Sequence, residues 1–177
     1  MAYAIVGYFD YKTDLFIKSI WKELADNDIC NYLYNSENNP HIKFLMFEEL
    51  ELDNVVPILY DFTQKHKKID VHLKNYGFFS NDTPTLFIDF SPSIQLLQLE
   101  SDIQNIFKSH GKAFNFNYFD ENIWMPSCQL TVKNENFAIK EAIELLLNKP
   151  LQFNGTIERI GIIEFHPAKQ LVSYSLI

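Results

Sequence analysis

Two short segments of the sequence carry polar side chains at a spacing of two residues, and each segment begins after a proline. They hold His41 and Lys43 after Pro40, and Ser127, Gln129 and Thr131 after Pro126. Residues two apart in a β-strand point to the same face of a sheet, so each set would face one way. An imidazole can transfer protons near neutral pH, a lysine carries a positive charge, and the other three side chains offer neutral hydrogen bonds. These residues are the first candidates for a functional site.

The two segments belong to an internal repeat with an offset of 86 positions. In each copy the proline-opened strand is followed by an acidic turn, a helix, and a strand with a glycine (Gly77 or Gly161) between apolar residues. Two such units predict an α+β domain with two lobes related by a pseudo-twofold axis, and a central cleft between two antiparallel sheets. The apolar residues expected to face the helices are Ile42, Phe44, Met46, Cys128, Leu130 and Val132. The polar candidates would then face the cleft.

Hydrophobic periodicity predicts the elements that must position these side chains. Strands are expected at residues 2–9, 40–47, 69–79, 84–90, 124–132, 151–165 and 169–176. Helices are expected to begin at Thr13, Asp53, Ser93 and Asn136, whose side chains can cap them. Pro57 fits the second helix only if it falls in the first turn.

Length and composition indicate one domain over residues 1–177, with 47% hydrophobic residues to form a core. The 23 acidic against 15 basic residues give a net charge of −8, which disfavours a broad nucleic-acid-binding face but allows a small local phosphate site. The sequence has two cysteines, no signal-peptide pattern at its N-terminus and no apolar stretch long enough to span a membrane. We therefore expect a cytoplasmic protein without membrane association.

The order of elements, with Pro-His-Ile-Lys at 40–43 and Trp-Met-Pro-Ser-Cys-Gln at 124–129, resembles the two-histidine phosphoesterase superfamily. That superfamily includes bacterial 2′-5′ RNA ligase-like proteins and 2′,3′-cyclic nucleotide phosphodiesterases. In its pattern, each lobe supplies a histidine followed two residues later by threonine or serine. The histidines serve as general base and general acid across a phosphodiester, and the hydroxyls hold the phosphate. The resemblance implies no metal and no cofactor.

This sequence departs from that pattern in both copies. His41 is kept, but Lys43 replaces the first hydroxyl residue. In the second copy Ser127 replaces the histidine and Gln129 the hydroxyl; in an alternative register Gln129 replaces the histidine and Thr131 keeps the hydroxyl. Neither register contains a second histidine, and serine and glutamine do not titrate near neutrality. The usual cycle would lose one acid–base group, whose contribution is about 10²–10⁴-fold.

Two functions remain as hypotheses. The first is a diverged 2′-5′ RNA ligase/cyclic phosphodiesterase-like protein that binds a small phosphodiester, a nucleotide or a short RNA end in the cleft. If it turns over, the resemblance implies metal-independent opening of a cyclic phosphate, with His41 as the catalytic acid or base. The residues implied to hold the phosphate are Lys43, Ser127, Gln129 and Thr131. The alternative is a non-catalytic binding or protein-interaction module. Arg159, the only arginine of the sequence, is a weaker candidate for a phosphate contact.

Overall fold

A computed structural model describes residues 2–79, 85–114, 124–132, 139–165 and 168–177. Within these residues, eight strands form one sheet in the order β5-β2-β1-β7-β3-β4-β6, with β8 paired to β7. Every paired neighbour runs antiparallel. The strands are β1 (Ala2–Phe9), β2 (His41–Leu50), β3 (Ile69–Phe79), β4 (Thr85–Phe90), β5 (Gly111–Ala113), β6 (Ser127–Gln129), β7 (Phe153–Phe165) and β8 (Lys169–Ser175).

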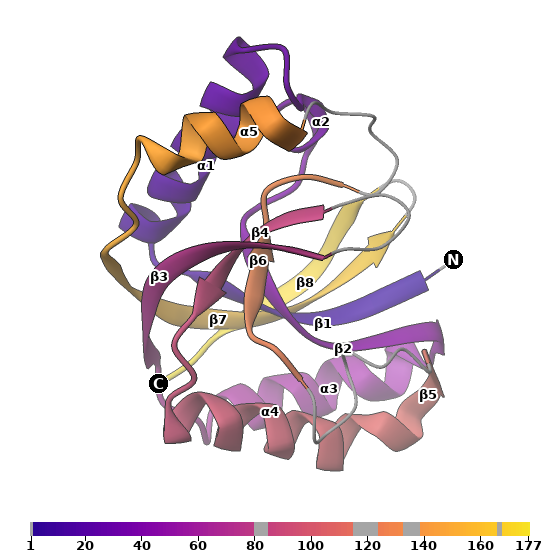
Figure 1. Cartoon of the computed structure of the whole chain (residues 1–177). Helices are drawn as coiled ribbons and strands as arrows, with labels where there is room; N and C mark the ends of the chain where they lie inside the picture. Colours follow the sequence, from indigo (N-terminus) through magenta and orange to yellow (C-terminus); the bar gives the residue numbers. More distant parts are fainter. Residues whose placement is uncertain (1, 80–84, 115–123, 133–138, 166–167) are drawn as a thin grey trace.

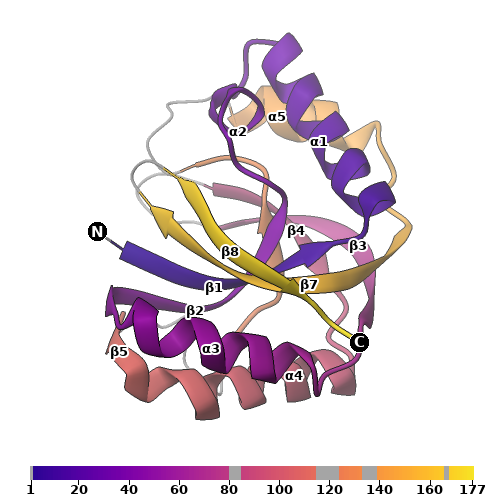
Figure 2. The ribbon, with the colours of Figure 1, turned by 180° about the vertical axis from the view of Figure 1, so that it is seen from behind.

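Two groups of helices flank the sheet. The helices are α1 (Tyr11–Asp26), α2 (Tyr32–Asn35), α3 (Leu52–Thr63), α4 (Ile94–Phe107) and α5 (Ile139–Leu147), and a 3₁₀ turn, η1 (Lys108–His110), continues α4. Figure 1 shows α1, α2 and α5 together at one end of the molecule and α3 and α4 together at the other, and the view from behind in Figure 2 agrees. The α+β, two-lobed prediction is confirmed. Because β3 pairs with β7, the strands of both lobes share one continuous hydrogen-bonded sheet.

The first helix begins earlier than the sequence predicts. Asp10, not Thr13, is the N-cap, and its Oδ1 accepts hydrogen bonds from the backbone N–H groups of Lys12 and Thr13 at 3.0 and 3.1 Å. The other carboxylate oxygen accepts from the Thr13 hydroxyl at 2.6 Å and from the Thr156 N–H at 2.7 Å, which ties α1 to β7. Gly155 leaves the space for this junction, since a Cβ there would lie 2.0 Å from Thr13 Oγ1.

The starts of α3 and α4 and the length of β6 can also be compared with the predictions. Helix α3 begins after Glu51, so Pro57 lies beyond the first turn and the helix continues through it. Strand β6 is shorter than the predicted strand over 124–132, because the N–H groups of Leu130 and Thr131 both donate to the Leu86 carbonyl and the ladder ends there. Ser93 caps α4 as predicted, accepting from the Leu96 N–H at 3.1 Å. The expected cap Asn136 lies outside the described residues.

The hydrophobic core contains two clusters on opposite faces of the sheet. Alternation along β1 divides them: Ile5 and Phe9 join the large cluster, which includes residues of all the longer helices, whereas Val6 and Tyr8 join a small one. Met46 packs on the small cluster, contrary to prediction. The pairing register between β1 and β2 shifts between Ile5 and Val6, so the alternation along β2 changes before Met46.

Candidate functional site

The structure brings the two proline-opened segments together. Strands β2 and β6 lie next to each other in space although four strands separate them in the sheet order. Lys43 Nζ donates a hydrogen bond of 2.6 Å to Gln129 Oε1, which joins the two copies of the repeat. This contact links the same pair of positions that the 86-residue repeat relates. The side chains at these two positions, one from each copy, are therefore in direct contact.

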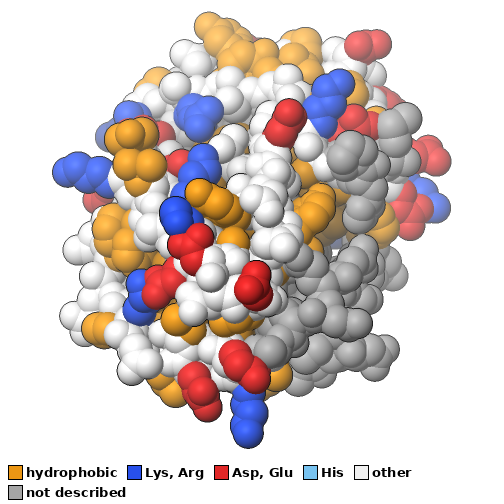
Figure 3. Space-filling view, turned by 90° about the horizontal axis from the view of Figure 1, so that it is seen from above, with side chains coloured by type: hydrophobic (Ala, Val, Ile, Leu, Met, Phe, Trp, Pro, Cys, Tyr) orange, Lys and Arg blue, Asp and Glu red, His pale blue; other side chains and the backbone are white. Residues whose placement is uncertain are grey.

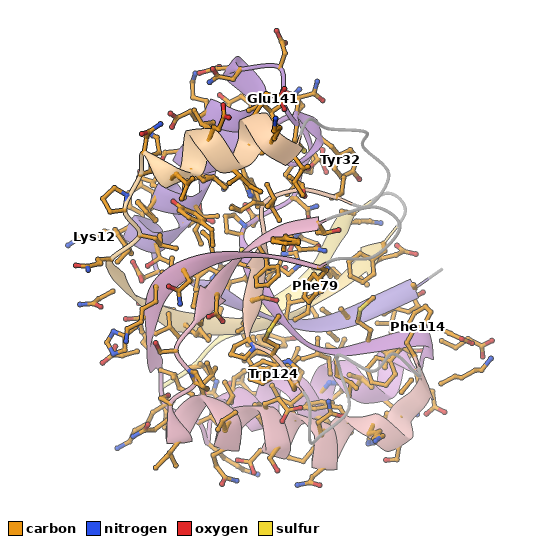
Figure 4. The ribbon with its side chains drawn as sticks, in the orientation of Figure 1. Lys12, Tyr32, Phe79, Phe114, Trp124 and Glu141 are labelled. Carbon is orange, nitrogen blue, oxygen red and sulfur yellow. The ribbon has the colours of Figure 1, made fainter. Side chains whose placement is uncertain are left out.

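Two tryptophans fix the backbone on either side of this contact. Trp124 Nε1 donates to the Lys43 carbonyl at 2.9 Å, and its ring stacks on Phe44 with centroids 5.5 Å apart. Trp21 Nε1 donates to the Gln129 carbonyl at 3.0 Å. Figure 4 shows Trp124 between the sheet and the α3–α4 end of the molecule. Sequence patterns indicate that such tryptophans are buried, but not which carbonyl each indole serves.

His41 is held as a neutral imidazole. Its Nδ1 lies 2.7 Å from the Asn39 carbonyl oxygen, which can only accept, so Nδ1 carries the proton and Nε2 keeps its lone pair. Burial, together with the positive charge of Lys43, lowers the pKa of His41 from 6.5 to about 3. In this state Nε2 can accept a hydrogen bond, but with this pKa it is only a weak base near neutral pH. It cannot deliver a proton near neutral pH.

Lys43 carries a positive charge that no acidic side chain among the described residues neutralises. Burial lowers its pKa from 10.5 to about 8, so the ammonium form still predominates at pH 7. Its hydrogen-bond partner Gln129 is neutral, and its Nζ lies 5.4 Å from the centroid of the Phe165 ring. Among the described residues no carboxylate forms an ion pair with it. An anion would therefore find an under-compensated positive charge here.

The other predicted ligands differ in placement. Ser127 is half-buried and lies two residues before Gln129 on β6, hence on the same strand face. Thr131 is fully buried, and its hydroxyl oxygen accepts from the Leu86 N–H at 2.9 Å. The structure thus gathers His41, Lys43, Ser127 and Gln129 on β2 and β6, while the Thr131 hydroxyl is bonded to the β4 backbone.

Cys128, between the two polar residues of β6, faces the large core cluster. Burial raises its pKa to about 12, although the backbone N–H of His41 and the charge of Lys43 act in the opposite direction. The thiol is therefore protonated near neutral pH. Its chemistry in this site is that of a small buried side chain.

Sequence reasoning missed Tyr8. Strand pairing places Tyr8 directly opposite His41 on one side and Arg159 on the other. The Tyr8 and His41 rings meet edge to face with centroids 6.3 Å apart, and the Arg159 guanidinium carbon lies 5.0 Å from the centroid of the Tyr8 ring. Directly paired residues share a face, so this row extends the site across β2, β1 and β7. Only the pairing register, which the sequence does not specify, reveals it.

Two further features concern ligands and membranes. In the parts of the chain that the structure describes, no group of three or more His, Cys, Asp or Glu side chains is arranged to hold a metal ion. Over the same residues, the helices are all too short or too polar to cross a bilayer.

Comparison with known proteins gives a fold but no close sequence relative. No family model and no curated protein matches the sequence. The crystal structure of TT0787 of Thermus thermophilus matches with a TM-score of 0.64 and 13% identity, covering 99% of this chain and 98% of that one. Escherichia coli LigT complexed with NADP+ matches with a TM-score of 0.64, 12% identity and coverages of 98% and 96%. The LigT complex with 3′-AMP matches with a TM-score of 0.63 and 13% identity, covering 98% of this chain and 97% of that one. The chain therefore has the two-lobed fold of LigT and related phosphoesterases.

Proposed function

We propose that this protein binds a small phosphodiester, a nucleotide or a short RNA end in the cleft between β2 and β6. The observation that carries the proposal is the Lys43–Gln129 contact, a half-buried cation held by a neutral partner where the two repeats meet. An ammonium group and an amide provide donors for phosphate oxygens. Solved structures of LigT with 3′-AMP, ATP and phosphate support a nucleotide as the ligand class.

The surface charge favours a short ligand. The net charge is −8, and Figure 3 shows basic and acidic side chains interspersed on the face that it displays. Extended nucleic acid requires many phosphate contacts from a basic surface. A local site with one or two cations suits a mononucleotide or the end of a strand.

Any turnover would use one acid–base residue. His41 Nε2 would accept a proton from an attacking water, whose oxygen bonds to phosphorus while one ester oxygen of a cyclic phosphate leaves and takes a proton from solvent. In either register the second histidine is replaced, by Ser127 or by Gln129, and neither side chain can supply that proton efficiently. We therefore expect slow hydrolysis without added metal, or binding alone. The second outcome corresponds to the alternative, a non-catalytic binding module.

The proposal is tested by measuring binding and hydrolysis in the same samples. The wild type, Lys43→Met and His41→Ala are titrated with 3′-AMP and incubated with a panel of 2′,3′-cyclic nucleotides. Because a hydrogen bond to a charged group contributes about 1.5–3 kcal/mol, Lys43→Met should weaken 3′-AMP binding by about 10-fold or more. Lys68→Met removes an exposed lysine paired with Glu158 and is the charge-matched control.

The outcomes separate the hypotheses. Hydrolysis that disappears in His41→Ala would support a phosphodiesterase with one catalytic histidine. Binding without hydrolysis would support the non-catalytic alternative. Absence of binding by the wild type, or equal loss in Lys43→Met and Lys68→Met, would refute the proposed site.

A further inference from the structure

A second pocket opens beside His41, on β1, β7 and β8. It has a volume of about 240 Å³. Its lining residues are Tyr8, Asn39, Arg159, Gln170, Leu171, Val172 and Ser173. We call it the Tyr8–Arg159 pocket. Asn39 links it to the proposed site, since its carbonyl oxygen is the partner of His41 Nδ1.

Among the described residues, two that line this pocket each have a buried polar atom without a hydrogen-bond partner, the hydroxyl oxygen of Tyr8 and Nε2 of Gln170. Tyr8 is only 3% exposed, and burial raises its pKa, so the hydroxyl keeps its proton. Both groups can therefore donate a hydrogen bond. Buried donors normally have partners, because an unsatisfied one costs about 1–3 kcal/mol. Two unsatisfied donors on residues of one pocket point to an acceptor that the described residues do not supply.

Arg159 adds a positive charge to the same pocket. Its Nη1 donates to the Ser173 hydroxyl at 3.2 Å, and its guanidinium carbon lies 5.0 Å from the centroid of the Tyr8 ring. No carboxylate pairs with it among the described residues, despite the excess of acids in the chain. Toward the part of the chain that the structure describes, only Nη1 makes a hydrogen bond, and the other N–H groups suit a planar or tetrahedral anion. The unmatched acceptor is thus an anion.

The glycine at position 161 gives Tyr8 and Ser173 the room they need. Gly161 is paired with Ser173, and a Cβ at that position would lie 2.7 Å from Tyr8 Cε2 and 3.0 Å from the Ser173 Cβ. The nearest atom would be the Val172 carbonyl oxygen at 2.6 Å, so a side chain on Gly161 would displace the tyrosine ring or the β8 backbone. The position of the Tyr8 ring, and with it the donor hydroxyl, depends on this close approach.

We propose that the Tyr8–Arg159 pocket binds a second phosphate group of the ligand whose first phosphate lies on Lys43 and Gln129. The inference rests on the proposed function and specifies its ligand class: a nucleoside bisphosphate or the phosphorylated end of an oligonucleotide. His41, Tyr8 and Arg159 occupy directly paired positions on three adjacent strands. Two strand spacings separate the backbones of His41 and Arg159 by about 10 Å, a span that one or two nucleotides can cover.

Calorimetric titration with adenosine 3′-monophosphate and adenosine 3′,5′-bisphosphate tests this inference. The wild type should bind the bisphosphate about 10-fold more tightly, the gain expected of an added Arg–phosphate interaction. Arg159→Met should abolish that gain, so that the two ligands bind this variant with nearly equal affinity. Tyr8→Phe should reduce the gain in affinity, and Lys43→Met should weaken the binding of both ligands. Lys68→Met removes an equal charge near β7 and should change the affinity for neither ligand.

The results distinguish the two proposals. If 3′-monophosphate binds through Lys43 but the bisphosphate gains nothing, or keeps its gain in Arg159→Met, the second phosphate site is refuted and the proposed function stands. If neither ligand binds the wild type, both proposals fail. Arg159 is exposed, so its substitution should not impair folding, and thermal unfolding of each variant verifies this.

Discussion

The lowered pKa of Lys43 predicts that ligand binding depends on pH in a range where ordinary lysines do not titrate. With a pKa of about 8, Lys43 is about 90% protonated at pH 7 and about 10% protonated at pH 9. If only the ammonium form binds phosphate, the affinity for 3′-AMP should fall about 10-fold between these values. A lysine with the usual pKa of 10.5 would give almost no change.

Other groups near the ligand do not interfere in this range. The second ionisation of a phosphate monoester lies near pH 6, so 3′-AMP keeps its charge above pH 7. His41 is already neutral, and Tyr8 and Cys128 stay protonated because burial raises the pKa of each. The decrease therefore reports on Lys43.

Isothermal titration at pH 7, 8 and 9 measures this decrease. In Lys43→Met, binding should be weak and independent of pH, whereas Lys68→Met should retain the wild-type profile. A flat wild-type profile would show that the Lys43 pKa is not lowered, and a slope that persists in Lys43→Met would assign the titration to another group. Either result would refute the electrostatic reasoning for this site.

Three further predictions concern stability. The folded pKa of His41, about 3, lies below the unfolded value of 6.5, so the unfolded chain binds the proton first and stability should fall as pH decreases from 6.5. The full loss, complete only below pH 3, is at most about 5 kcal/mol, and about 2–3 kcal/mol of it should fall between pH 7 and 4.5. Urea unfolding at these two pH values should show this loss of unfolding free energy in the wild type but not in His41→Gln; an equal loss in both proteins would contradict the prediction. Gly155→Ala should cost about 1–3 kcal/mol through its clash with Thr13, and Thr13→Ala in the same chain should recover part of this, whereas no recovery would exclude that clash as the cause. Trp124→Phe should keep the ring contact with Phe44 but cost about 1 kcal/mol for the lost hydrogen bond to the Lys43 carbonyl, and unchanged chemical denaturation would show that this bond contributes nothing.

Local patterns in the sequence were sufficient to predict most of the fold. The alternation after Pro40 and the period of the helical segments depend on neighbouring residues, so the main elements could be predicted. The repeat predicted that Lys43 and Gln129 face one cleft, but not that they bond to each other. The start of α1 could not be predicted, because Asp10 caps the N–H groups of Lys12 and Thr13, ahead of those that a Thr13 cap would bind, and also binds Thr156, far along the chain.

The rest of the site depends on long-range pairing. Tyr8 and Arg159 lie opposite each other only because of the pairing register between β1 and β7. Met46 lies on the opposite face of the sheet from the predicted one because the register between β1 and β2 shifts. The separation of Thr131 from the predicted cleft face has a similar origin, because the ladder with β4 ends at Gln129 and its hydroxyl bonds to the Leu86 N–H. Such registers are set by side-chain packing between segments that are distant in sequence.

The pairing of β1 with β7 has a consequence for folding during synthesis. Residues 2–9 find their central sheet partner only in residues 153–165, so the ribosome must complete most of the chain before the two can meet. Until then, one edge of β1 has no hydrogen-bonded partner strand, and its apolar side chains, buried in the finished fold, remain partly uncovered. Contacts of such long sequence separation slow folding and prolong the exposure of unpaired strands. A nascent chain stalled before β7 should therefore be sensitive to proteolysis and prone to association through β1, whereas release of the whole chain allows the sheet to form.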